Sequence, residues 1–481
     1  MEPNKTEKLF TLSQFRKELG IPLIIARKLV VWGEVETVKA FDGTLRIAES
    51  EVVKIAGVIG NPWEKTKIFF RALGPGLITG ASDDDPSGIG TYSSVGAKFG
   101  LSIIWMAAWL LPIMLAVQEV CARIGIVTNK GLAGVMERHY KKKFVVGIIS
   151  LLIFANIVNI GADLGAMAAS LRMLTGFNFF AGVIFFSLLS IAMEVFAGYH
   201  IYVKFLKWLS ISILSYVVAG FMIHPDWRPI LEKMFIPHVE FSEEYVFAMI
   251  AVFGTTITSY LFFWQTSEEV EETKLARDLS GKESQEPMRS RIARMRTDVS
   301  TGMILANVVF FFITLTTAQV LFNSGIHNIG SAEEAAQALR PLAGDYAYLL
   351  FAFGIIGTGL LAVPILAGSG AYAMAEVMKW NEGLELKFSK ARGFYMVIIL
   401  SILFGMFFNF LQINPIVALY WAAFINGIIA LPLLAVIMIV GNDKKIMGDE
   451  THPLWVKIFG WLAVVFMVLA VLGIIAFQIF I

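Results

Sequence analysis

Long apolar runs dominate the chain beyond residue 66, and each is long enough to cross a membrane. A helix needs about 20 consecutive, mostly apolar residues to span the hydrocarbon layer. About eleven such segments occur, at residues 69–98, 101–126, 144–171, 178–197, 201–223, 245–265, 299–322, 346–375, 392–411, 414–440 and 454–480. The pattern predicts an all-α polytopic membrane protein, with residues 67–481 as an eleven-helix transmembrane domain.

Residues 1–66 have a different pattern, with mixed charge and no long apolar run. The sequence predicts helices over TLSQFRKELG, IPLIIARKLVVWGEV and ESEVVKIAG, and two strands around an Asp42-Gly43 turn. This order resembles the winged helix-turn-helix heads of excisionase and MerR-type DNA-binding proteins. Residues 2–65 hold ten basic and nine acidic side chains, so a basic DNA-binding surface is not expected. We expect a cytosolic regulatory or packing head, without nucleic-acid binding through residues 11–55.

The composition agrees with a membrane protein, because 57% of the residues are hydrophobic and only 16% are charged. The net charge of +1 indicates no anionic partner. A single cysteine, Cys121, excludes an internal disulfide and a cysteine-rich zinc site. The start of the chain, MEPNKTEKLF, does not have the pattern of a removable signal peptide.

Basic residues between the segments predict the orientation, because Lys and Arg concentrate in cytoplasmic loops. With the N-terminus in the cytoplasm, most loop cations fall inside. These include Arg123, Lys130, Arg138, Lys141, Lys142, Lys143, Lys274, Arg277, Lys379, Lys387, Lys390, Lys444 and Lys445. The C-terminus is then external, and we expect a multi-pass protein of the cell membrane.

The stretch LGPGLITGASDDDPSGIGTY, residues 73–92, interrupts the first apolar segment. Gly and Pro are tolerated at membrane depth only where the freed backbone groups are buried in protein or line a wet cavity. Pro86 breaks the helix beside Asp85, and an ionisable residue in a spanning segment indicates a functional site. Carboxylate oxygens and free carbonyls suit a hard cation. We expect Asp85 at this site, and Asp83 and Asp84 as solvated caps at the membrane surface.

A second interruption lies in the sixth segment, where the polar sequence GTTITS, residues 254–259, stands between apolar flanks. Taken alone, such a cluster is typical of close helix packing. Interruptions in corresponding segments of two halves, however, indicate a transporter site built from inverted repeats. Here the halves are segments one to five and six to ten. We therefore expect the two breaks to meet near the centre of the bilayer.

Several motifs follow one another along the transmembrane part. They are GPG, then after eight intervening residues Asp85-Pro86, then ARIGIVTNKGLAG, ADLG, GTTITS, and ALPLL followed by GNDKKIMG. The series resembles the natural resistance-associated macrophage protein (NRAMP) family of divalent metal transporters, over roughly residues 69–481. The resemblance implies the LeuT-type fold, an inverted repeat of five plus five helices with an eleventh. It also implies a metal site between the broken first and sixth helices.

The sequence departs from the family pattern at two metal-ligand positions. Members usually read Asp-Pro-Gly-Asn in helix one and Ala-x-x-Met-Pro-His in helix six. Here Gly88 replaces the Asn and Thr258 replaces the Met thioether. Loss of soft sulfur favours Mg²⁺ and Mn²⁺, and small residues leave room for the waters that Mg²⁺ retains. The pattern is similar to the NRAMP-related magnesium transporter branch.

Three further departures concern proton coupling. Tyr260 replaces the helix-six His, and Asn156 and Ala166 replace two helix-three Glu residues. A proton relay needs groups that titrate near the working pH. We therefore expect voltage-driven uptake with weak or no proton coupling.

The sequence predicts a transporter that moves Mg²⁺ or Mn²⁺ by alternating access. The expected metal contacts are Asp85, Thr255, Thr258, Asn426 and Gly88, and Asn426 lies within one residue of a Gln that the family carries. No cofactor is expected, and no P-loop, nucleophile elbow or HExxH pattern indicates an enzyme. Two alternatives stay open: a sodium-coupled carrier of an organic solute on the same fold, and a membrane-embedded metal sensor with a DNA-binding head. The oligomeric state is open.

Overall fold

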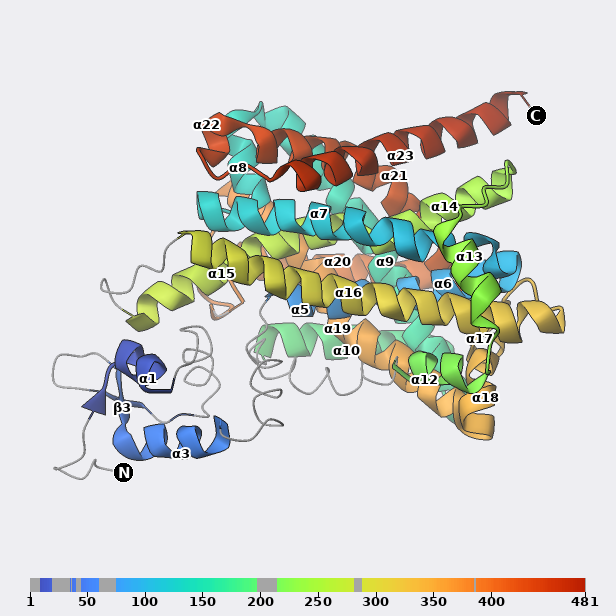
Figure 1. Cartoon of the computed structure of the whole chain (residues 1–481), viewed down its shortest axis with the longest axis horizontal. Coiled ribbons are helices and arrows are strands. Elements are labelled where there is room, and N and C mark those ends of the chain that lie inside the picture. The colour runs from blue at the N-terminus through green and yellow to red at the C-terminus, as the bar shows by residue number, and fades with distance from the viewer. Residues whose placement is uncertain are drawn as a thin grey trace.

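The computed structural model describes residues 9–19, 35, 37–39, 45–59, 75–196, 214–280, 288–384 and 386–480. Long helices that run side by side make up most of the molecule (Figure 1). Within the described residues, nine stretches are long and apolar enough to cross a membrane. They comprise α7 (Trp105–Thr128), α9 (Lys142–Thr175), α10 (Phe179–Phe196), α14 with α15 (Glu243–Thr256 and Ser259–Ser280), α16 (Met288–Val320), α19 (Ala347–Met378), α20 (Arg392–Phe408), α21 (Pro415–Asn442) and α23 (Leu454–Phe480).

These nine stretches match nine of the predicted segments. The described part of the first predicted segment consists of two shorter helices, α5 (Pro75–Asp83) and α6 (Pro86–Phe99). Of the fifth, the described part contains α12 (Ser215–Met222), and residues 201–213 lie outside the described residues. The helices α15 and α16 extend well beyond the predicted bounds, because hydropathy marks only the part of a helix that lies in lipid. Short helices join the spans: α8 (Leu132–His139), α13 (Trp227–Phe235), α17 (Ala332–Ala336), α18 (Arg340–Ala343) and α22 (Lys444–Met447).

Both predicted breaks are present. Asp85 has an extended backbone, with φ −68° and ψ 172°, and forms the N-cap of α6, with Pro86 in the first turn. Proline is favoured there because the N–H groups of the first turn have no acceptor within the helix, so a residue without an N–H loses no hydrogen bond. The second break falls at residues 257–258, between the end of α14 and the start of α15.

The membrane helices pack in two groups. The first contains α5, α6, α7, α14, α15 and α16, which are the first two spans of each half. The second contains α9, α10, α19 and α20, which are the third and fourth spans of each half. This correspondence between halves is what an inverted repeat predicts. The two broken helices both belong to the first group, and the unbroken α9 of the second group contacts α6 beside them.

Two glycine contacts set the closest helix approaches around the breaks. A Cβ at Gly80 of α5 would lie 2.3 Å from the backbone carbonyl of Gly302 in α16. A Cβ at Gly254 of α14 would lie 2.1 Å from Ala423 O and 2.3 Å from Gly427 N in α21. Small residues allow such backbone contact between membrane helices, where packing rather than the hydrophobic effect holds helices together.

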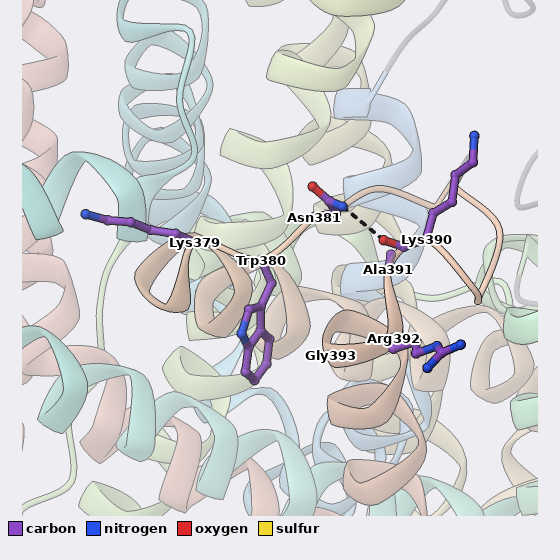
Figure 2. A pocket seen from close by; sticks show the side chains of 7 residues that line it. All are labelled: Lys379, Trp380, Asn381, Lys390, Ala391, Arg392 and Gly393. Atoms are coloured by element: carbon purple, nitrogen blue, oxygen red, sulfur yellow. Dashed lines mark hydrogen bonds between the residues drawn. The ribbon is translucent and has the colours of Figure 1, made fainter.

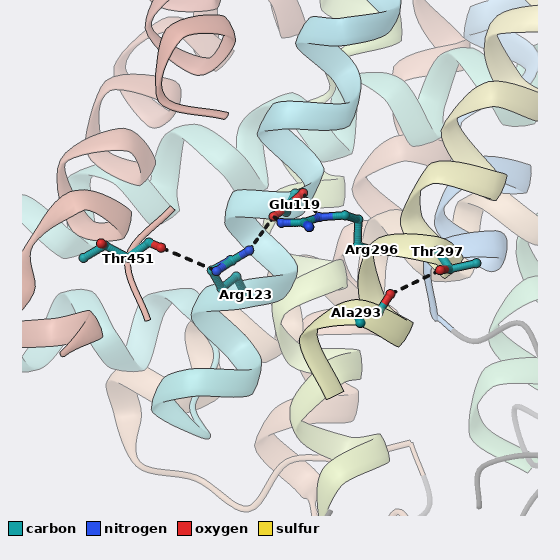
Figure 3. Close-up of polar contacts among 6 residues, drawn as sticks. All are labelled: Glu119, Arg123, Ala293, Arg296, Thr297 and Thr451. Atoms are coloured by element: carbon teal, nitrogen blue, oxygen red, sulfur yellow. Dashed lines mark hydrogen bonds and ion pairs between the residues drawn. The ribbon is translucent and has the colours of Figure 1, made fainter. Parts of the chain in front are cut away.

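A buried carboxylate connects α7, α16 and the loop before α23 (Figure 3). Glu119 accepts hydrogen bonds from Arg123 Nη2 at 2.5 Å and from Arg296 Nε and Nη2 at 2.9 and 2.7 Å. Arg123 Nη1 also reaches Thr451 O at 3.5 Å. The side chains of Glu119 and Arg123 are only 2% and 5% exposed, whereas that of Arg296 is 42% exposed. Glu119 therefore compensates the buried charge of Arg123, which removal of Glu119 would leave without a carboxylate partner.

The N-terminal elements form a small separate core. An antiparallel sheet of β1 (Leu9–Phe10), β3 (Leu45–Ala48) and β2 (Thr37–Lys39), in that order, packs with α1 (Leu12–Leu19) and α3 (Glu49–Ile59). Its buried apolar residues are Phe10, Phe15, Val35, Ile47, Val52 and Ile55. The helices and paired strands lie where the sequence places them, and β1 was not predicted. The expected helix over residues 21–35 lies almost wholly outside the described residues, so the winged helix-turn-helix character stays a prediction.

Candidate metal centre

Asp85 lies at the centre of the first break and is fully buried. Its Oδ1 accepts a hydrogen bond from Gly88 N at 2.7 Å, which satisfies a free N–H at the start of α6. Its Oδ2 accepts a hydrogen bond from Asn159 Nδ2 at 2.9 Å. The carboxylate is thus fixed by its own helix on one side and by α9 on the other.

Asn159 connects Asp85 to Asn426, which the sequence predicted, and to Asp163. Its Oδ1 accepts a hydrogen bond from Asn426 Nδ2 in α21 at 3.2 Å, and its Nδ2 lies 3.4 Å from Asp163 Oδ2, one turn along α9. Asn426 Oδ1 is buried and has no hydrogen-bond partner among the described residues. The first break, α9 and α21 therefore meet at one row of polar side chains: Asp85, Asn159 and Asn426.

The second break meets the first through hydroxyl groups. Ser87 Oγ lies 3.2 Å from Thr255 Oγ1. The hydroxyl of Tyr92 in α6 lies 3.2 Å from that of Thr256 in α14. A Cβ at Gly88 would lie 3.5 Å from Thr255 Oγ1, so the absence of a side chain there leaves the hydroxyl accessible to the first break.

The structure therefore brings Asp85, Gly88 and Thr255 together and joins Asn426 to them through Asn159. Thr258 lies at the second break and is 1% exposed. Sequence reasoning missed Asn159 and Ser87. A signal for Asn159 exists, since it stands one helical turn before Asp163 in NIGAD, although an isolated Asn in a membrane helix more often indicates packing.

The expectation for Asp83 and Asp84 was wrong. They are 1% and 5% exposed, at the inner end of α5, and not solvated caps. Both carboxylate oxygens of Asp83 and Oδ1 of Asp84 have no hydrogen-bond partner in the described part of the chain. Their position follows from the early break: α5 ends inside the protein, so the residues at its end are enclosed by the surrounding helices.

Four carboxyl groups are consequently buried around the first break: Asp83, Asp84, Asp85 and Asp163. Asp84 and Asp85 act on Asp83 as like charges, and Asp85 does so on Asp84 and on Asp163. A buried charge is costly unless an opposite charge compensates it. The region is therefore suited to a positive ion.

The donor atoms suit a hard ion bound with water. The described residues contain no group of three or more His, Cys, Asp or Glu side chains that could hold a metal by themselves. Asp85, Thr255 and Asn426 supply carboxylate, hydroxyl and amide oxygens. Such donors, with backbone carbonyls and water, are typical ligands of Mg²⁺ and Mn²⁺.

Two residues at family relay positions form structural hydrogen bonds. Tyr260 OH donates to Ser82 O at 2.8 Å and so joins the end of α5 to the start of α15. Asn156 Nδ2 donates to Leu366 O at 2.8 Å and to Ser369 Oγ at 2.9 Å in α19. Each side chain holds two helices together.

Comparison with known proteins agrees with this geometry. A family model described as natural resistance-associated macrophage protein-like matches residues 76–476. The divalent metal cation transporter MntH of Klebsiella pneumoniae (strain 342) is 24% identical over 407 residues, which cover 84% of this chain and 93% of that protein.

Solved structures show the shared fold. A manganese transporter of Eremococcus coleocola superposes with a TM-score of 0.68 at 18% identity, over 85% of this chain and 87% of that one. Mhp1, a nucleobase-cation-symport-1 family transporter, superposes with a TM-score of 0.53 at 14% identity, over 84% and 92%. The LeuT-type fold predicted for the transmembrane part is thereby confirmed.

Proposed function

Since the chain belongs to the natural resistance-associated macrophage protein-like family, we propose that this multi-pass membrane protein transports divalent metal cations by alternating access. The names of its relatives, a divalent metal cation transporter and a manganese transporter, support this class of substrate. The position of the site supports the mechanism. Asp85 belongs to one helix group and Asn159 to the other, so a relative movement of the groups changes the surroundings of the ion.

One observation carries the proposal: Asp85 is fully buried where the two broken helices meet, and the carboxyl groups of Asp83, Asp84 and Asp163 are buried around the same break. Asp85 supplies the charged ligand. Thr255, Thr258 and Asn426 supply polar or water-mediated contacts, and Gly88 leaves space for water. Asn159 holds the Asp85 carboxylate in place.

We propose Mg²⁺ and Mn²⁺ as the cations. Threonine at position 258 offers a hydroxyl where the family carries a thioether, and oxygen donors favour harder ions. Mg²⁺ binds few protein ligands and keeps several waters, which agrees with a site that offers one hydrogen-bonded carboxylate and small polar side chains.

We also propose that coupling to protons is weak or does not occur. Tyr260 and Asn156 occupy the relay positions and are engaged in hydrogen bonds between helices. Neither changes its charge near neutral pH. The membrane potential then drives uptake, because about 2.3 kcal/mol per 100 mV acts on each elementary charge.

For the orientation, we propose a cytoplasmic N-terminus and an external C-terminus. An odd number of spans and the distribution of loop cations support this arrangement. The elements of the N-terminal head and the C-terminal end lie at opposite ends of the helices in Figure 1.

Competition of Mg²⁺, Mn²⁺ and Ca²⁺ in proteoliposomes tests the function. Wild type should take up Mg²⁺ and Mn²⁺ in response to an inside-negative potential, without acidification of the lumen. Asp85→Ala should lose both ions together, whereas Asp449→Ala, at an exposed aspartate outside the membrane helices, should retain them. Uptake that persists in Asp85→Ala would contradict the assigned site. Sodium-dependent uptake of an organic solute would favour the sodium-coupled carrier, and metal-dependent DNA binding by the whole protein would favour the sensor.

A further inference from the structure

A polar pocket lies at the membrane boundary, where α19 ends and α20 begins (Figure 2). It has a volume of about 300 Å³ and is lined by Lys379, Trp380, Asn381, Lys390, Ala391, Arg392 and Gly393. Three of these seven residues are cationic and none is acidic. Both flanking helices are candidate membrane spans, ending at Met378 and starting at Arg392. The pocket therefore faces the headgroup layer of one leaflet.

Two contacts shape the pocket. Asn381 Nδ2 donates a hydrogen bond to Lys390 O at 3.1 Å, which closes the loop between the two helices. A Cβ at Gly393 would lie 2.4 Å from the Trp380 ring, so the indole packs directly on the first turn of α20. Tryptophan is favoured at this depth because its apolar ring and polar N–H suit the lipid–water boundary.

The cationic side chains stand at the rim. Figure 2 shows Lys390 and Arg392 on one side of the loop and Lys379 extending on the other. All three are exposed, and Lys379 reaches Glu137 only at 3.4 Å, with 75% of its side chain exposed. No side-chain hydrogen bond caps the N-terminus of α20, where backbone N–H groups favour an anion.

An apolar stripe continues from the pocket along α20. Met396, Leu400, Phe404 and Phe407 are 44%, 44%, 56% and 60% exposed. The first three follow Arg392 at intervals of four residues, so the stripe begins on the face of Arg392 and winds gradually around α20. An exposed stripe of this kind on a membrane helix contacts acyl chains.

From these observations we propose that the pocket binds the phosphate-bearing headgroup of an anionic phospholipid, with an acyl chain along the α20 stripe. Lys390 and Arg392 compensate the phosphodiester and the headgroup charge. In the orientation proposed above, this face lies in the cytoplasm, where anionic lipids attract basic segments. The site is separate from the metal centre and does not depend on the proposed transport.

Native mass spectrometry of the delipidated whole protein tests the proposal. Wild type should retain phosphatidylglycerol more tightly than phosphatidylcholine. Lys390→Gln with Arg392→Gln should weaken phosphatidylglycerol binding by about thirtyfold, because each basic group near the lipid surface contributes about fivefold. Lys142→Gln with Lys143→Gln, an exposed cationic pair at the start of α9, is the control and should keep the preference.

Two further arms distinguish a lipid from a soluble anion. Leu400→Ser should weaken phosphatidylglycerol binding, and glycerol phosphate at the same concentration as the lipid should not displace it. Displacement by glycerol phosphate would overturn the lipid as the ligand. A preference that survives Lys390→Gln with Arg392→Gln, or that wild type does not show, would overturn the site.

Discussion

Asn159 donates a hydrogen bond to Asp85 across 2.9 Å, joining the middle of an unbroken helix to the point where another helix is interrupted. Asn159 lies within α9, so the helix fixes its backbone and restricts where its side-chain amide can lie. It therefore limits the positions that the Asp85 carboxylate can adopt when an ion is bound. Among the described residues, this is the one side-chain hydrogen bond that Asp85 receives from the other helix group.

Replacement of Asn159 by Ala should weaken metal binding. A hydrogen bond to a charged group contributes about 1.5–3 kcal/mol, which corresponds to about a tenfold to hundredfold loss of Mn²⁺ or Mg²⁺ affinity. Isothermal titration calorimetry measures this change. Asn156→Ala is a matched control, since this residue lies one turn away on α9 and contacts α19 instead of Asp85. Equal losses in the two variants would contradict a specific role for Asn159.

Gly80→Ala should destabilise the packing of α5 on α16. The added Cβ would lie 2.3 Å from the Gly302 backbone, which cannot rearrange as a side chain does. Overpacking of this kind costs about 1–3 kcal/mol or more. The melting temperature in detergent should fall, and uptake should fall with it. Gly147→Ala on α9, where a Cβ meets nothing within 4 Å, should leave both unchanged or slightly raise the melting temperature. An unchanged Gly80→Ala protein would show that the two helices separate easily.

Glu119→Gln should destabilise the protein strongly, because it leaves the 5% exposed Arg123 without a negative partner. Breaking one side of a buried ion pair costs about 3–5 kcal/mol. Glu244→Gln breaks the pair with Lys98, in which Glu244 is 70% exposed, and should cost less than about 1 kcal/mol. Thermal unfolding of the two variants provides the comparison. Combined replacement of Glu119 and Arg123 by Leu should recover much of the loss, and no recovery would mean that the charges act independently.

Acid should destabilise the protein in part through His452. Burial, followed by the charges of Arg123 and Lys457, lowers the pKa of this histidine to about 3. In the unfolded chain its pKa is about 6.5. The unfolded state therefore binds more protons below pH 6.5, and the stability that His452 contributes above this pH is lost progressively as the pH falls toward 3.

The melting temperature followed from pH 8 to pH 4 measures this effect. In His452→Gln the decline below pH 6.5 should be shallower than in wild type. His224→Gln, at an exposed histidine, should follow the wild-type curve. A decline of the same slope in His452→Gln would exclude this histidine as a source of acid sensitivity.

The sequence predicted the two breaks because Pro and Gly next to carboxylates or hydroxyls are tolerated in a spanning segment only where protein or a water-filled cavity satisfies the polar groups. Asp85, Gly88 and Thr255 follow from that argument. Asp83 and Asp84 were expected at the membrane surface because burying a carboxylate is costly. Whether they are buried depends, however, on where α5 ends and on which helices enclose that end, and the local sequence does not show either. Asn159 was missed because its partner is 74 residues away, and no local pattern shows which residue of a long apolar helix faces a distant break.

The contact between Gly254 and Gly427 also bears on the transport cycle. Where these two backbones touch, no side chain separates α14 from α21. In the proposed transport cycle we therefore expect the two helices to move together. Thr255 and Asn426, each adjacent to one of these glycines, should then keep the same separation in the inward-open and outward-open states.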